Sequence, residues 1–359
     1  MPPSIRTLVD FDLMPSNPSS LQFRAAVIGC GTIGASASAS EDVGILSHAE
    51  AIAACPQTDL VAFCDSDAGA VKNALNAYQL DQDAAFTSID ELLTKAKPQF
   101  VSIATPDATH ASVAMKVLAC ESVRAVLLEK PIALDTAEAE KLVNTAKDRN
   151  IAFAVNFSRR YSRRFQTLRN EIYEGRFGLL QSVTGFYTKG ILHNGSHWID
   201  LLRFLTGEQI TDVRAIPHND TNDHDSTPDV DFRLASGVVA HLVGCDKDAF
   251  TLFEMDLLFS DGRIQMTDSG HSINVMRPQL SSRYAGYKFL EQETSTTQQP
   301  AMKDLMLYAV EDLVASVGET RIPISSASDA LMAARVGKAV IESLQIDEMW
   351  LSVNSDRLK

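Results

Sequence analysis

The feature that most constrains the fold is the stretch AAVIGCGTIG at residues 25–34. A short apolar run, typical of a buried strand, leads directly into a glycine pattern formed by Gly29, Gly31 and Gly34. Such glycines allow a tight turn, a close approach of the backbone to a pyrophosphate, and close packing of a helix on the strand. The pattern therefore predicts a dinucleotide site at the start of a helix, where N–H groups can hold phosphates.

The following hundred or so residues repeat the alternation that such a site requires. Further short apolar runs, separated by helical segments, lie at residues 60–64, 100–104, 125–128 and 151–155. Runs of this kind are typical of strands in a parallel sheet that helices cover on both faces. We predict a doubly wound α/β domain of the Rossmann type over residues 23–155, preceded by a polar N-terminal extension at residues 1–22.

After residue 156 the pattern changes to strands joined by turns. The tripeptides ASG before Val238 and SDG before Arg263 are hairpin signals. We predict a second, α+β domain over residues 156–300, built on a large, mainly antiparallel open sheet. Two amphipathic helices within residues 301–359 are expected to pack back at the junction of the domains.

Asp65 ends the second apolar run, where a carboxylate can bind the ribose hydroxyls of an adenosine. No Lys or Arg lies between residues 65 and 71 to neutralise a 2′-phosphate, which favours NAD over NADP. Asp65 follows Gly34 by 31 residues, whereas about 20 after the motif is usual. The excess at residues 35–46 predicts an extra loop or a distorted helix start beside the pyrophosphate, either a cofactor clamp or a surface insertion.

Four motifs, in this order, resemble those of the Gfo/Idh/MocA oxidoreductases. They are the glycine pattern, TPDATH at 105–110, EKP at 129–131 and GxHxxD at 195–200. The chain is similar to this family from residue 24 to about residue 345. The resemblance implies a Rossmann domain, a C-terminal domain whose open sheet often forms an oligomer interface, and hydride transfer at a sugar or cyclitol carbon. It also implies a homodimer or homotetramer assembled through the C-terminal sheet.

The cofactor contacts are expected at the carboxyl ends of the strands, where ligands bind in doubly wound sheets. Besides the three glycines and Asp65, the expected contacts are Thr32, Ile33, Thr105, Pro106, His110, Glu129 and Lys130. The resemblance implies that Thr105 and Pro106 line the nicotinamide ribose. His110 is expected either to contact the cofactor or to serve only the start of its helix.

Lys130 and His197 are the candidate catalytic residues. Lys130 follows a buried strand, so its ammonium can hydrogen-bond a substrate oxygen and stabilise charge on it. His197 matches the proton acceptor of the family, and a place near a helix N-terminus favours the neutral imidazole that accepts a proton. Asp200 lies three residues later and is expected either to orient this ring or to belong to the core.

His193 stands where the family usually has an aspartate. His193 and His197 are four apart, as metal ligands on a helix can be, but the chain has no H-E-x-x-H motif. Gly195 indicates that His193 precedes the helix, so we expect no metal site. His193 and Asn194 are interpreted as contacts to substrate hydroxyls or as turn-forming residues.

The segment NFSRRYSRRFQTLR at residues 156–169 opens the second domain. It resembles the family's linker, which often borders the active site. Most of its arginines are explained by a solvated helix face. Arg160 or Tyr161 is the residue that we expect to reach the substrate.

The net charge and the cysteine content limit the kinds of partner and the cellular setting that we expect. A formal net charge of −14 disfavours nucleic acid and anionic membrane surfaces. No apolar stretch approaches the roughly 20 residues of a membrane span. The five cysteines include no C-x-x-C pair, which predicts a reduced, cytoplasmic setting without disulfides.

These features predict an NAD(P)-dependent dehydrogenase or reductase that acts on a sugar, a sugar derivative such as a nucleotide- or phospho-sugar, or a cyclitol. Two alternatives remain at this stage. One is a non-catalytic, NAD-binding sensor of the same fold. The other is an oxidoreductase that recycles a tightly bound cofactor between two substrates.

Overall fold

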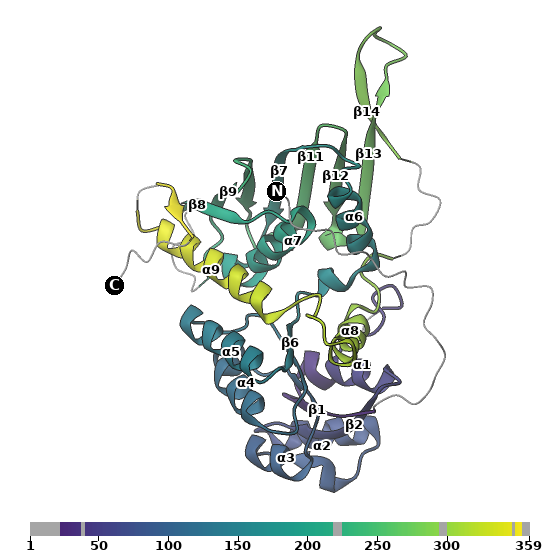
Figure 1. Cartoon of the computed structure of the whole chain (residues 1–359), viewed down its shortest axis with the longest axis vertical. Helices are drawn as coiled ribbons and strands as arrows, with labels where there is room; N and C mark the ends of the chain where they lie inside the picture. The colour runs from purple at the N-terminus through teal and green to yellow at the C-terminus, as the bar shows by residue number, and fades with distance from the viewer. Residues whose placement is uncertain (1–21, 37–39, 218–224, 294–299, 347–348, 354–359) are drawn as a thin grey trace.

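The computed structural model describes residues 22–36, 40–217, 225–293, 300–346 and 349–353. Two sheets organise them: a six-stranded sheet in the lower half of Figure 1 and a nine-stranded sheet in the upper half. The α/β fold class predicted from the sequence is confirmed. All but the last residue of the predicted N-terminal extension lies outside the described residues.

The six-stranded sheet is parallel throughout, with the order β3-β2-β1-β4-β5-β6. The strands are β1 Phe23–Ile28, β2 Thr58–Cys64, β3 Ala85–Phe86, β4 Phe100–Ile103, β5 Ala125–Leu128 and β6 Ala152–Val155. Every residue of β4 and β5 is buried, as their continuous apolar sequences require. The order reverses between β1 and β4, so a ligand crevice is expected at the carboxyl ends of these strands.

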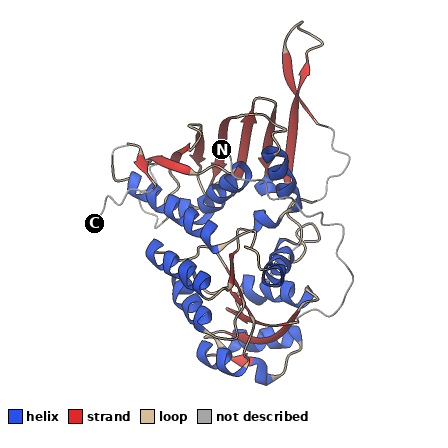
Figure 2. Cartoon of the chain, in the orientation of Figure 1, coloured by secondary structure: helices blue, strands red, loops and turns tan. Residues whose placement is uncertain are grey.

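Helices cover both faces of this sheet (Figure 2). They are α1 His48–Ala54, α2 Ala68–Tyr78, α3 Ile89–Lys95, α4 His110–Ala119 and α5 Thr136–Asp148, with short 3₁₀ turns at Gln82–Ala84 (η2) and Asp107–Thr109 (η3). In the part of the chain that the structure describes, no helix is both long and apolar enough to cross a membrane.

The first helix of the Rossmann half is interrupted, as the inserted residues 35–46 predict. A π-helical turn, η1 Thr32–Ser36, follows the glycine loop, and α1 starts only at His48, where the Ser47 hydroxyl accepts from the Glu50 N–H. Between them, the Ile45 N–H donates to the Asp304 carboxylate at 2.9 Å. The expected distorted helix start is confirmed, and the described end of the insertion is tied to the residue that precedes α8.

The nine-stranded sheet has the order β14-β13-β12-β11-β7-β10-β9-β8-β15, in which only β7 and β10 pair parallel. Its strands are β7 Leu180–Tyr187, β8 Ile210–Ile216, β9 Asp229–Leu234, β10 Val239–Gly244, β11 Phe253–Phe259, β12 Gly262–Thr267, β13 Ser272–Leu280, β14 Lys288–Gln292 and β15 Leu351–Ser352. The two hairpin signals are confirmed, because β9 turns into β10 and β11 into β12. The β13–β14 hairpin projects from the top of Figure 1.

Buried and half-buried residues alternate along β11 and β12, so one face of this sheet packs on a core. The remaining helical segments are η4 Ser158–Tyr161, α6 Arg163–Tyr173, η5 Gly190–Gly195, α7 Ser196–Thr206, η6 Asp268–Gly270, α8 Leu305–Glu319 and α9 Ala327–Ser343. Trp198 of α7 is fully buried and stacks on Phe232 of β9, with ring centroids 5.7 Å apart. This packing fixes α7, and with it His197, against the sheet.

The closing helices join the two halves. Helix α8 packs against α1 and β5, and α9 packs against α5, α7 and β8. At the same junction, the buried guanidinium of Arg160 pairs with Asp200 at 2.8 Å and with Asp329 at 3.2 Å. The two ion pairs of Arg160 therefore hold η4, α7 and α9 in one arrangement around the carboxyl ends of the parallel strands.

Candidate active site

The glycine loop has the geometry of a dinucleotide site. Gly29 has a φ of +96°, and a Cβ placed there would collide with the Ala104 carbonyl. A Cβ at Gly34 would collide with the Gly29 carbonyl oxygen, because η1 packs closely on β1. A Cβ at Gly31 would meet nothing within 4 Å, so the backbone there faces open space that a phosphate can approach. The loop therefore fits the pyrophosphate of a dinucleotide.

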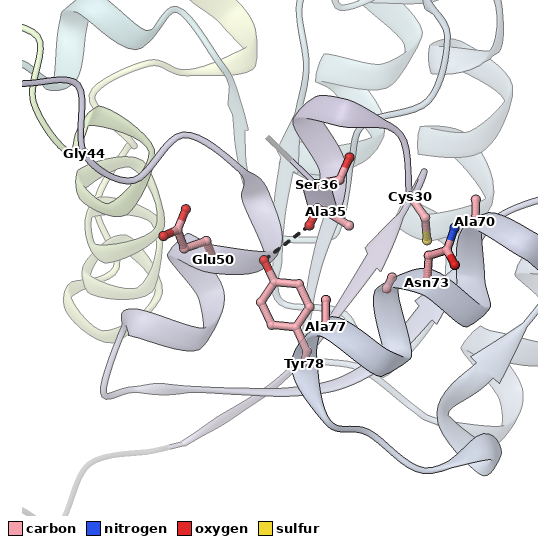
Figure 3. Close-up of a pocket in the computed structure, with 10 residues that line it drawn as sticks. Cys30, Ala35, Ser36, Gly44, Glu50, Ala70, Asn73, Ala77 and Tyr78 are labelled. Atoms are coloured by element: carbon pink, nitrogen blue, oxygen red, sulfur yellow. Dashed lines mark hydrogen bonds between the residues drawn. The ribbon is translucent and has the colours of Figure 1, made fainter. Parts of the chain in front are cut away.

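The carboxylate of Asp65 lies directly beside this loop. Its Oδ2 accepts a hydrogen bond from the Cys30 N–H at 2.7 Å, and its Oδ1 accepts from the Asp67 N–H at 2.9 Å. A cavity of about 650 Å³ adjoins Cys30 between η1 and α2 (Figure 3). Glu50 is the charged residue of its lining, and no Lys or Arg of the described chain lines it. This side of the site therefore offers carboxylates, rather than cations, to a ribose.

Thr105 and Pro106 follow β4 at the same edge of the sheet and are partly exposed. His110, by contrast, is fully buried at the start of α4. One of its ring nitrogens lies 2.6 Å from the Pro131 carbonyl oxygen and the other 2.8 Å from that of Thr105. Of the two roles expected of His110, the geometry supports the structural one at the helix start, since neither ring nitrogen is free.

Glu129 turns away from the crevice and into the interior. Its Oε1 accepts hydrogen bonds from His48 Nε2 at 2.9 Å and from Asn156 Nδ2 at 2.6 Å. The ring of His48 is fully buried, and its other nitrogen pairs with the Ser102 hydroxyl. Burial raises the pKa of Glu129, but the hydrogen bonds from His48 and Asn156 and the nearby Lys130 charge outweigh it, so the net pKa is lowered. These bonds make Glu129 an internal anchor through Oε1, and its contact with the cofactor stays a prediction.

Lys130 points the other way and meets His193. The Lys130 Nζ lies 2.8 Å from Nδ1 of His193, which stands in the π-helical turn η5. Burial lowers the pKa of Lys130, and the charges of Glu129, Asp107 and Asp225 partly oppose this. Burial and the Lys130 charge also lower the pKa of His193. The Lys130–Pro131 peptide is cis.

His197 occupies the first turn of α7, next to this pair. Its half-buried ring lies edge-on to Phe157, with centroids 5.4 Å apart. No hydrogen bond joins either ring nitrogen to another residue that the structure describes. Burial, followed by the charges of Arg159, Lys130 and His193, lowers the pKa of His197 well below 6.5. The ring is therefore neutral and unengaged, which is the state that a general base requires.

Asp225, between β8 and β9, is a site residue that the sequence analysis missed. Its two carboxylate oxygens accept hydrogen bonds from the N–H groups of Leu192 and His193, each at 2.8 Å. Its charge also acts on Lys130. A carboxylate thus borders the site although residue 193 is not acidic. Nothing in the sequence pointed to it, because 33 residues separate it from Leu192.

Arg160 and Tyr161 lie in the interior. Arg160 is 5% exposed and held by Asp200 and Asp329, and Tyr161 is 1% exposed. This corrects the expectation that one of them reaches the substrate. Asp200 is buried and pairs with Arg160, and no hydrogen bond joins it to His197. Of its two expected roles, the structure therefore supports the one in the core. Among the described residues, no group of three His, Cys, Asp or Glu side chains could hold a metal ion.

Comparison with known families and curated proteins gives a consistent result. The family model described as an oxidoreductase family with an NAD-binding Rossmann fold, GFO_IDH_MocA, matches residues 23–157. UDP-N-acetylglucosamine 3-dehydrogenase of Acidithiobacillus ferrooxidans is 31% identical over 228 residues, which are 62% of this chain and 66% of the relative. Inositol 2-dehydrogenase of Rhizobium meliloti is 29% identical over 211 residues, 53% and 62% of the two chains. The matched segments thus span just under two thirds of these relatives.

Among solved structures, levoglucosan dehydrogenase in complex with NADH and L-sorbose is similar over most of its length. The TM-score is 0.77 at 18% identity, and the match covers 93% of this chain and 99% of the other. At this identity the similarity concerns the fold, which extends over both sheets and the closing helices.

Proposed function

Since the chain belongs to the Gfo/Idh/MocA oxidoreductases, we propose that it is an NAD-dependent dehydrogenase or reductase of a sugar, a sugar derivative or a cyclitol. The observation that carries the proposal is the arrangement at the end of β5. There Lys130 reaches across to His193, and a neutral, unengaged His197 stands beside them. A cation that can polarise an oxygen and a base that can take its proton are what alcohol oxidation requires.

Each residue has a distinct role in the proposed reaction. A bound nicotinamide would supply the hydride acceptor or donor. In the oxidative direction, the Lys130 ammonium hydrogen-bonds the reacting hydroxyl oxygen and His197 takes the hydroxyl proton, while the carbon loses its hydride and the C–O bond becomes a carbonyl. In the reductive direction, protonated His197 returns that proton to the oxygen. Lys130 exchanges its His193 partner for the substrate oxygen when the substrate binds.

The substrate class follows from the polar groups around this pair. His193 and Asn194 of η5 offer nitrogen donors, and the Asp225 carboxylate lies against the same turn, which suits several neighbouring hydroxyl groups. The names of the curated relatives, a UDP-N-acetylglucosamine 3-dehydrogenase and an inositol 2-dehydrogenase, support a polyhydroxylated ring.

We assign NAD as the preferred cofactor on the basis of Asp65. A carboxylate beside the glycine loop accepts hydrogen bonds from ribose hydroxyls and repels a 2′-phosphate. The cavity next to it contains Glu50 and no cation among its described lining residues. The fold neighbour that binds NADH is consistent with this assignment.

We also propose that the protein is a cytoplasmic homo-oligomer that associates through the outer face of the nine-stranded sheet. Phe186 of β7 is 43% exposed on the sheet, among paired charges such as Arg263 and Asp256. Light scattering on the purified chain would test this, because a monomer at micromolar concentration would contradict it.

The experiment that tests the proposed function is a nicotinamide absorbance assay. Purified protein would be incubated with NAD and a panel of cyclitols, free sugars, sugar phosphates and nucleotide sugars. We expect turnover with at least one member and a rate at least about 100-fold lower with His197→Ala at the same protein concentration. Failure of every panel member in both directions would contradict the proposal.

A further inference from the structure

A second cavity, of about 250 Å³, is lined in part by residues that are next in sequence to the candidate catalytic residues. Its walls come from three parts of the chain: residues 131–136 after β5, Phe157 with Leu192 and Ser196, and the face of α9 between residues 330 and 341. An apolar cavity of roughly 150 Å³ is large enough to hold benzene. This one can therefore hold a ring or a short alkyl chain.

The pocket is contiguous in sequence with the candidate catalytic residues. Pro131 follows Lys130, Leu192 precedes His193, and Ser196 precedes His197. In addition, the ring of Phe157 contacts the His197 imidazole edge-on. Phe157 both lines the pocket and contacts His197, so the pocket borders the candidate catalytic residues.

The lining favours apolar groups over hydroxyls, because its polar side chains are mostly engaged. Asp135 caps α5 by accepting from two backbone N–H groups, the Ser196 hydroxyl donates to the His193 carbonyl at 2.8 Å, and Lys338 pairs with Glu342 at 3.8 Å. Thr136 is the remaining polar residue of the lining. A sugar hydroxyl placed here would lose water without gaining a full set of partners.

The rim of the pocket is apolar as well. Leu134 is 67% exposed and Leu192 is 38% exposed, and both are large apolar side chains that ordinary core packing would cover. The wall formed by α9 contributes small residues, including Ala334 and Gly337. A Cβ at Gly337 would come within 3.1 Å of Leu192, so the glycine keeps this wall from crowding the rim.

We propose that this pocket is a substrate subsite for an alkyl or aryl substituent, such as the aglycone of a glycoside. The polyhydroxylated ring lies at Lys130 and His197, and its apolar substituent lies between the 131–136 segment and α9. For its catalytic part the inference rests on the proposed function. It narrows the substrate class from any sugar to one that carries an apolar group.

The first arm of the test needs no knowledge of the sugar. Crystals of the protein pressurised with xenon should show an ordered xenon atom in the pocket, because xenon binds apolar cavities. The Ala334→Phe variant, which places a ring in the cavity from the half-buried face of α9, should lose that peak. Absence of xenon from the wild-type pocket would overturn the assignment of an apolar site.

The second arm compares the methyl and phenyl glycosides of whichever sugar shows turnover. We expect the phenyl compound to have a kcat/KM about tenfold higher, because the ring gains buried apolar area. Ala334→Phe should remove this advantage, so that the phenyl and methyl compounds have kcat/KM values within about twofold of each other. Equal values for the two compounds in the wild type would overturn the subsite.

A milder variant protects the test against misfolding. Leu134→Ser changes only the exposed rim and should reduce the phenyl preference about threefold. Leu179→Ser is its matched control, because Leu179 is 80% exposed and lies outside the pocket lining. An identical phenyl preference in the two variants would contradict the proposed contact between Leu134 and the phenyl group. If the wild type turned over no sugar, the proposed function would fail while the xenon arm still decided the pocket.

Discussion

Glu129 and Lys130 are neighbours in the chain, yet they belong to opposite sides of the site. Glu129 faces inward and is held by His48 and Asn156, which makes it part of a buried hydrogen-bonded group. Lys130 faces outward and meets His193 in an irregular helical turn. The inner side is engaged with protein partners and fixes the position of the backbone. On the outer side, the partner of Lys130 is one imidazole nitrogen of His193, which a substrate oxygen can replace.

The same difference separates two histidines. His48 is fully buried with both ring nitrogens engaged, whereas His197 is half-buried and neither nitrogen bonds another described residue. A buried, engaged imidazole stabilises the fold, and an unengaged neutral one can accept a proton. The contrast predicts that substitutions on the inner side act on stability and those on the outer side act on turnover.

The largest effect is expected on the outer side. His197→Ala removes the proton acceptor and should lower kcat about 10²–10⁴-fold, and Lys130→Met should come close to this. Both should change the free energy of unfolding by less than about 1 kcal/mol, because neither side chain is fully buried. Steady-state kinetics and urea denaturation measure the two quantities. His241→Ala, on the exposed part of β10, is the control, and a kcat for His197→Ala equal to that of the control would break the comparison.

On the inner side, Glu129→Ala should destabilise the protein by about 3 kcal/mol, because it leaves buried donors on His48 and Asn156 unpaired. Denaturant unfolding would measure the loss. Glu91→Ala, which breaks an exposed pair with Lys95, is the matched control and should cost at most about 0.5 kcal/mol. Equal losses in the two variants would contradict the role of Glu129 as an anchor.

The anchor also has a definite pH dependence. The folded-state pKa of Glu129 is lowered from 4.5, so its ionised form stabilises the fold above pH 4.5. That contribution should disappear as the pH falls through the lower, folded-state pKa. Unfolding curves of the wild type and Glu129→Gln between neutral and acid pH should therefore converge at low pH. Curves that stay equally far apart at every pH would refute this linkage.

The smallest expected effect concerns the cofactor. Asp65→Ala removes the carboxylate beside the glycine loop and should raise the Kd for NAD about tenfold, because a charged hydrogen bond to the ribose is lost. The Kd for NADP should rise less or fall, since the repulsion of its 2′-phosphate is removed as well. Calorimetry on both nucleotides would measure the ratio, with the exposed Asp59→Ala as control. An unchanged NAD to NADP ratio would contradict the assigned role of Asp65.

Local patterns were sufficient for the parallel sheet and the glycine loop. The apolar runs of β1, β2, β4, β5 and β6 mark strands by themselves. Gly29 is required locally by its positive φ, and Gly34 is required by the Gly29 carbonyl five residues earlier. The distorted start of the first helix also followed from a local count, the spacing between Gly34 and Asp65. Features that depend on one short segment can therefore be predicted from a single sequence.

Contacts between distant segments could not be predicted. His48 and Glu129 are 81 residues apart, and Arg160 finds Asp200 across 40 residues. Arg160 or Tyr161 was expected to reach the substrate because their segment resembles the family's linker, and no local pattern signalled that both side chains are buried. The role of His110 stayed open between a cofactor contact and the helix start, since both of its ring partners are backbone carbonyls that no sequence pattern marks.

The pH dependence of kcat/KM for substrate oxidation tests the central claim most directly. Burial and nearby positive charges keep the pKa of His197 well below 6.5, so the base stays deprotonated as the pH falls through 6.5. The predicted profile is flat through this range, with an acid limb below pH 6.5 that disappears in His197→Ala. An acid limb centred at or above 6.5, or one that persists unchanged in His197→Ala, would contradict the account.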